Sequence, residues 1–267
     1  MNMLSSLIRL SAVIAVASMT ACDVSKPDPD KTGMITLEFD NVVGDKDLIL
    51  DTDTYTNVAG ETFSVTTLNY FVSNIRLKKA DGTYYTYPQD QSYFLVKEAD
   101  DATHGIELEV PEDDYTGMEF ILGVDSLRST ADVSQRTGVL DPATNGMYWS
   151  WNSGYIFMML EGISPQAPAD PTGVNSFQYH TGGFGGYSSV TINNIKKITL
   201  DFNGEEALVR GKSHPEVHIY ADLLKFFDGP NADVSIAEHP VVHFNAYSTT
   251  LSENYSRMFT VDHVHNE

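Results

Sequence analysis

Apolar and polar residues alternate in short runs along most of the chain, which is the pattern of β-strands that bury one face. The first two runs, MITLEFDNVV (34–43) and DLILDTDTY (47–55), flank Gly44-Asp45 and predict a hairpin. Comparable runs follow at short spacing: TFSVTTLNYFVSNIRLKK, TYYTY, SYFLVKE, GIELEVPEDDY, MEFILGVD, SSVTINN, KKITLDFNG, ALVRG, EVHIYADLL, PVVHFNAY and FTVDHVH. This succession predicts an all-β fold, an antiparallel β-sandwich or flattened barrel of short strands.

Helical periodicity is scarce, so we expect only one or two short helices. The best candidate is ADLLKFFDG (221–229), in which Asp222 lies early and Gly229-Pro230 supplies a stop signal. The strands show no internal repeat, which favours one domain over a repeat array.

Both tryptophans of the chain lie in one segment, YWSWNSG, two residues apart at Trp149 and Trp151. Turn residues at Asn145-Gly146 precede them, and Gly154 separates them from a second apolar run. The period of two places both indoles on one face of a strand, side by side. The simplest interpretation is a strand, a bend and a strand whose aromatic rings fill a β core.

The first 21 residues form an export signal rather than part of the fold. Arg9 is the only charged side chain there, and an apolar run leads to Ser18-Met19-Thr20-Ala21-Cys22, the pattern of a lipoprotein cleavage site. Cys22 is the only cysteine, which favours lipidation over a disulfide. We therefore expect a leader over 1–21, a flexible tether over 22–32 that begins with lipidated Cys22, and one domain over 33–267. The protein would be lipid-anchored in the cell envelope, to a membrane facing the periplasm or the cell surface.

The chain is strongly acidic, with 37 Asp and Glu against 16 Lys and Arg and a formal net charge of −21. Such a surface disfavours nucleic acid and anionic lipid head groups as partners. It suits cations or a basic protein, and it also confers solubility.

The common enzyme signatures are absent: the sequence has no HExxH, no paired CxxC, no GxSxG and no phosphate-binding loop. Two histidine pairs have a spacing of four, His214 with His218 and His239 with His243. Their segments contain proline and β-branched residues and read as strands, in which four positions span about 13 Å. We interpret these four as surface or structural histidines, because two such imidazoles would not share one ion.

Three other histidines are better placed for metal chemistry. The terminal run FTVDHVH puts His263 and His265 on the face of a strand that also carries Phe259 and Val261, about 7 Å apart along the chain. This end binds a metal or is a frayed terminus. His180 lies in FQYHTGGFGGYS, where four glycines allow the backbone to approach whatever the histidine faces.

These segments resemble the MbnP-like copper-binding family of exported bacterial proteins. The resemblance rests on GVDS (123–126), GVLDPATNGMYWSWNSGYIFMMLEG (138–162), FQYHTGG (177–183) and FTVDHVHN (259–266), and extends over most of the chain from about residue 33. The core pattern is specific, because Leu-Asp-Pro, Gly-Met, Trp-x-Trp, Gly-Tyr and Glu-Gly recur in fixed order.

The resemblance implies a β-rich protein that binds copper, as Cu(I) or Cu(II). In some relatives one ligand is kynurenine, which a partner di-haem enzyme of the cytochrome peroxidase type makes from a tryptophan. Carried over by position, the ligands would be Trp149 or Trp151, His180 and His263, with His265 as a further candidate. Imidazole suits copper, whereas an intact indole offers no nitrogen lone pair. Met147, Met158 and Met159 offer thioether sulfur but rank below the histidines.

We therefore expect a copper-binding lipoprotein, not an enzyme, that binds, stores or delivers one copper ion. One alternative is a surface module that binds glycan or protein through exposed tyrosines and acidic loops. Another is a zinc enzyme that uses the same histidines, with Glu161 or Asp262 as the base.

Overall fold

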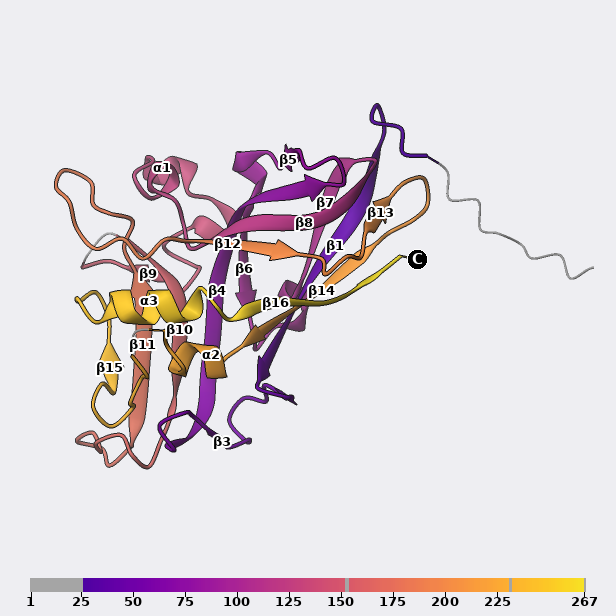
Figure 1. Cartoon of the computed structure of the whole chain (residues 1–267). Coiled ribbons are helices and arrows are strands. Elements are labelled where there is room, and N and C mark those ends of the chain that lie inside the picture. The colour runs from indigo at the N-terminus through magenta and orange to yellow at the C-terminus, as the bar shows by residue number, and fades with distance from the viewer. Residues whose placement is uncertain (1–25, 152–153, 231, 267) are drawn as a thin grey trace, which may run out of the picture.

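The computed structural model describes residues 26–151, 154–230 and 232–266. Strands are the dominant regular structure and build two curved sheets, while the helices are short (Figure 1). The all-β prediction is therefore confirmed. The leader expected over 1–21 and the lipidated Cys22 lie outside the described residues.

The smaller sheet has the strand order β16-β14-β1-β2, and β7 also pairs with β1. Its strands are β1 (Thr32–Val43), β2 (Lys46–Asp47), β7 (Gly105–Pro111), β14 (Glu216–Asp222) and β16 (Phe259–His265). The alternation along β1 buries Ile35 and Leu37 on one face and leaves Thr36 and Glu38 on the other. β1 and β14 are parallel, whereas the other pairs in this sheet are antiparallel.

The larger sheet has the order β12-β8-β4-β10-β11-β15, with short strands added beside β4, β8 and β10. Its strands are β3 (Tyr55–Thr56), β4 (Thr62–Lys79), β5 (Tyr84–Thr86), β6 (Tyr93–Lys97), β8 (Asp113–Leu122), β9 (Tyr148–Trp149), β10 (Gly154–Ile163), β11 (Ser176–Gly182), β12 (Lys196–Asp201), β13 (Ala207–Val209) and β15 (Val241–Val242). β4 is 18 residues long and runs through the middle of the molecule (Figure 1). β15 joins β11 in parallel, and the other pairs of this sheet are antiparallel.

The main core lies between the inward faces of the two sheets. Phe39 of the smaller sheet meets Phe120 of the larger one with ring centroids 5.8 Å apart, and Phe259 packs against Phe120 at 5.2 Å. Both contacts are edge-to-face, the favourable geometry for aromatic rings. The outward faces of the sheets consequently carry polar side chains, the histidine clusters and the double-tryptophan segment.

A second, smaller core covers part of the outward face of the larger sheet. It contains Phe71, Tyr93, Leu95, Val124, Leu140, Met147, Trp149, Tyr155, Ile156 and Phe157. Phe71 and Phe157 point here because their strand neighbours Tyr70 and Met158 point into the main core. The buried hydroxyl of Tyr155 donates to the carbonyl of Leu140 at 2.6 Å and so ties the long connection before β9 to the sheet. This cluster is what holds the double-tryptophan segment in place.

The α-helices are α1 (Ser126–Ser129), α2 (Leu224–Phe227) and α3 (Ser248–Tyr255), and four single 3-10 turns lie at 89–91, 101–103, 133–135 and 138–140. The helix predicted over 221–229 is shorter than expected, because Ala221 and Asp222 complete β14. The sequence did not predict α3, which has only a weak apolar stripe. Among the described residues, no helix is long and apolar enough to span a bilayer.

The predicted hairpin is confirmed, with Val43 opposite Lys46 across Gly44-Asp45, but its second strand has only two residues. The run SSVTINN (188–194) forms no strand and contributes one isolated bridge, between Phe184 and Asn193. Three glycines just before it take positive φ values and turn the chain away from the sheet: Gly183, Gly185 and Gly186.

Candidate metal centre

The two tryptophans lie side by side, as predicted, although the strand beneath them is short. β9 ends at Trp149, and Trp151 lies in the turn that follows. Their ring centroids are 5.5 Å apart at an interplanar angle of 43°. Trp149 is only 5% exposed, whereas Trp151 is 65% exposed. The pair therefore has one buried and one accessible indole.

Trp149 lies over the end of β11. A Cβ atom at Gly182 would come within 2.8 Å of the indole and 2.3 Å of the carbonyl oxygen of Tyr155, so only glycine leaves room for the ring. Phe244 contacts the same indole from another side, with ring centroids 6.0 Å apart. The glycines after His180 thus serve the close approach that the sequence suggested, and the ring that approaches is Trp149.

His180 lies on the same strand and face as Gly182, two residues earlier. It is directly opposite Met159 of β10 in the antiparallel ladder, so both side chains point to the outward face of the sheet. The Nε2 atom of His180 lies 2.7 Å from Oε1 of Glu161. This contact leaves Nδ1 as the nitrogen that can bind a metal, since a carboxylate holds the proton on the other ring nitrogen.

His243 completes the group, although the sequence had classed it as surface or structural. β15 pairs in parallel with β11, with Gln178 opposite Val241 and Tyr179 opposite Val242. The next residues in this register are His180 and His243, whose rings stack with centroids 4.7 Å apart and an interplanar angle of 15°. The Nε2 atom of His243 is buried and has no hydrogen-bond partner among the described residues.

Burial lowers the pKa of His243 below its usual value, and the neighbouring His180 lowers it further. A neutral imidazole whose buried nitrogen has no partner is costly for a fold to keep. It is also the form of histidine that a metal ion requires. Two stacked imidazoles, with Met159 opposite His180 on the neighbouring strand, are residues that fit a copper ion.

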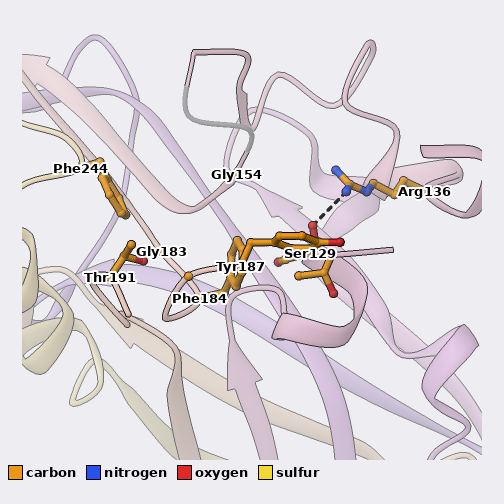
Figure 2. A pocket seen from close by; sticks show the side chains of 10 residues that line it. Ser129, Arg136, Gly154, Gly183, Phe184, Tyr187, Thr191 and Phe244 are labelled. Carbon is orange, nitrogen blue, oxygen red and sulfur yellow. Dashed lines mark hydrogen bonds between the residues drawn. The ribbon is translucent and has the colours of Figure 1, made fainter. Parts of the chain in front are cut away.

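A cavity of about 380 Å³ opens beside this group (Figure 2). Phe244 and Gly183 form one side of it, and Tyr187 and Arg136 lie toward the other. The guanidinium of Arg136 donates to the carbonyl of Ser129 at 2.9 Å, which fixes that wall. Phe244, the residue that follows His243, thus lines the cavity, and the two histidines do not.

The lowered pKa of His243 predicts a pH dependence of the metal-free protein. Between its folded pKa and about 6.5, the unfolded chain binds a proton that the folded chain does not. The free energy of unfolding should therefore fall as the pH drops below about 6.5, and a His243→Gln variant should lose less stability. Urea unfolding of both proteins at pH 7.5 and 5.0 tests this expectation. Equal losses in the two proteins would contradict it.

His263 and His265 do not join this group. They lie on β16, the edge strand of the smaller sheet, with His218 of β14, whereas His180 is on β11 of the larger sheet. The C-terminal end of β16 and the β11–β15 edge lie on opposite sides of the molecule in Figure 1. The structure therefore does not bring His180 and His263 together, because their strands belong to different sheets.

The other predicted candidates divide in the same way. Met147 and Met158 are fully buried in the two hydrophobic cores, so of the three methionines Met159 is the one beside His180. His239 stacks on Tyr247 with centroids 3.7 Å apart, and His214 contacts Thr36, so in each pair the first histidine has a contact other than its partner four positions on. Strand spacing alone argued against both pairs as chelates. What it missed is that His218 and His243 meet histidines from other strands.

A family model described as MbnP matches residues 32–244. Among solved structures, MbnP from Methylosinus trichosporium matches with a TM-score of 0.51 and 16% sequence identity, over 81% of this chain and 82% of that one. At this identity the likeness supports the fold. No curated protein sequence matches the chain. The family model includes the double-tryptophan segment, His180 and His243, and the chain belongs to the MbnP family.

Proposed function

We propose that this protein is an extracytoplasmic copper-binding protein that holds a copper ion at His180 and His243, next to Trp149, and stores or delivers it without turnover. The observation that carries the proposal is the stacked pair of imidazoles in which the buried Nε2 of His243 has no partner. Family membership supports a copper-related role.

Copper fits the donor set better than the harder divalent ions do. Cu(I) is soft and accepts imidazole nitrogen and thioether sulfur, and Met159 lies directly opposite His180. Glu161 would orient His180 through the 2.7 Å contact to Nε2. In this role Glu161 orients a ligand and is not needed as a catalytic base. The arrangement therefore favours a binding protein over a zinc enzyme.

Trp149 would supply a further ligand after oxidation to kynurenine, because opening the indole exposes an aromatic amine with an available lone pair. It is the tryptophan that packs at Gly182, next to the imidazole pair. Trp151 stacks on it and is 65% exposed, so a partner oxidase of the di-haem peroxidase type would reach the pair from the Trp151 side. In this proposal the partner supplies the oxidant that cleaves the indole ring, and hydrolysis then releases the lost ring carbon as formate.

The same proposal includes the location. The leader over 1–21 and the lipidated Cys22 would place the domain outside the cytoplasm, tethered to a membrane by its N-terminus. The protein would then bind copper outside the reducing cytosol.

Intact-mass spectrometry and copper analysis of protein purified from its native cells test this function. We expect near-stoichiometric copper and a mass gain of about 4 Da, since kynurenine replaces one ring carbon of tryptophan by oxygen. Trp149→Phe should abolish the gain, and Trp151→Phe is the matched control. Parent protein that binds no copper in either oxidation state would overturn the proposal. A mass gain that survives Trp149→Phe would overturn the assignment of Trp149.

A further inference from the structure

Three imidazoles converge on the outward face of the smaller sheet. They belong to His218 of β14 and to His263 and His265 of β16, and one ring nitrogen from each lies within 4.8 Å of the others. The rings of His218 and His263 stack with centroids 4.3 Å apart, and His265 meets His263 edge-on at 4.8 Å. This group, the β14–β16 triad, is separate from the His180–His243 pair on the larger sheet.

A β-bulge creates the triad. Ile219 is opposite Val261, but His218 is opposite His263, so Asp262 is an extra residue in β16. In a regular ladder, the period of two would place His263 and His265 on the inward face with Phe259 and Val261. The extra residue moves both histidines to the outward face beside His218, and Val264 packs against the core instead. One inserted residue thus changes a strand end into three converging ligands.

Carboxylates hold two of the three rings. Asp262 Oδ2 lies 2.6 Å from Nδ1 of His263, and Glu216 Oε1 lies 3.1 Å from Nε2 of His218. Each contact leaves the opposite ring nitrogen as the one with a free lone pair. Metal-binding histidines are commonly oriented by a carboxylate in this way.

The surroundings of the triad suit a cation that reaches it from solvent. A cavity of about 270 Å³ is lined by His214, Glu216, His218 and His265. Glu38 of the adjacent strand lies opposite His218 in the parallel ladder and adds a further carboxylate on this face. The three imidazoles are partly exposed, so an ion can enter without any opening of the fold.

We propose that His218, His263 and His265 form a second metal site, independent of the His180–His243 centre, that takes a divalent first-row ion, Zn²⁺ or Cu²⁺. Three imidazoles with an open fourth position are an established donor set for Zn²⁺, and among divalent ions Cu²⁺ binds nitrogen ligands most tightly. The site lacks thioether sulfur, so it favours these ions over Cu(I). Two of its three residues, His263 and His265, lie beyond residue 244, where the match to the family model ends, whereas His218 lies within the matched range.

Titration calorimetry of the mature protein with ZnCl₂ and then with CuSO₄ tests the site. To separate the two centres, the titration is done in the parent and in the His180→Ala/His243→Ala variant. Both should bind one equivalent of Zn²⁺, and adding His218→Ala with His263→Ala should remove that equivalent. The Cu²⁺ complex of the His180→Ala/His243→Ala variant should show nitrogen hyperfine structure in its electron paramagnetic resonance spectrum.

Asp262→Asn keeps all three imidazoles and should weaken Zn²⁺ binding by about tenfold or more, because it removes only the carboxylate that orients His263. His239→Ala is the matched control, since that ring stacks on Tyr247 instead. Unchanged melting temperatures would show that the variants fold. The inference is overturned if the His180→Ala/His243→Ala variant binds no divalent ion, or if loss of His218 and His263 leaves the Zn²⁺ equivalent in place. Neither result depends on whether the other centre binds copper.

Discussion

Replacing His180 and His243 together by alanine is expected to lower the affinity for copper by more than a hundredfold. The physical reason is that both imidazoles are direct ligands in our proposal, and even the loss of a group that only orients a ligand costs about 10–100-fold. Met159 and the kynurenine proposed to form from Trp149 would remain from the donor set on this face. Competition with a chromophoric Cu(I) chelator, with the protein reduced and under anaerobic conditions, measures the change.

Two further variants make this experiment specific. Glu161→Gln keeps both imidazoles but cannot hold the proton of His180 as a carboxylate does, so we expect an intermediate loss of about 10–100-fold. His239→Ala removes a histidine only four residues before His243, whose ring stacks on Tyr247, and should bind copper like the parent. If the double variant competes for Cu(I) as well as the parent does, these histidines are not the ligands.

Gly162→Ala is expected to destabilise the fold strongly, although the residue lies in a strand at a regular backbone conformation. A Cβ atom at this position would lie 2.1 Å from the carbonyl oxygen of Ser64 and 2.5 Å from the ring of Phe177. The first contact is with backbone in the β10–β4 ladder, beside the irregularity between Glu161 and Gly162, and cannot relax by a side-chain rotation. We expect a loss of about 3 kcal/mol or more in the free energy of unfolding, at the upper end of overpacked sites.

For a domain of this size, such a loss lowers the melting temperature by roughly 6–12 °C. Differential scanning calorimetry of the metal-free protein measures it. Gly60→Ala is the matched control, because its Cβ would meet nothing within 4 Å and only the positive φ of 77° costs energy, about 1 kcal/mol. If Gly162→Ala and Gly60→Ala have the same melting temperature, the β10–β4 ladder accommodates the added methyl group and the prediction is wrong.

The local features of the chain were largely predictable. The period of two identified most strands of the two sheets, and Gly44-Asp45 identified the hairpin between Val43 and Lys46. The adjacency of Trp149 and Trp151 followed from their spacing, as the ring separation of 5.5 Å shows. The family resemblance, which depends on residue order, was likewise confirmed by the family model.

The candidate sites needed the tertiary structure. No local pattern states that the short strand β15 lies parallel to β11, yet this pairing alone brings His243 to His180. His218 was set aside because its partner along its own strand is too distant, whereas its real neighbours come from β16 across the sheet. Strand partners are set by contacts between residues far apart in sequence, and a single strand carries little information about them.

What the sequence alone determined is the alternation that makes an all-β domain, the turns between its strands and the identity of the residues that can bind metal. What only the tertiary structure decided is which of those residues meet. The physical reason is the period of two: one extra residue, Asp262, reverses the face of every later side chain in its strand. His180 and His263, which the sequence pattern had assigned to one site, lie in different sheets. Each of them lies beside a histidine from another strand.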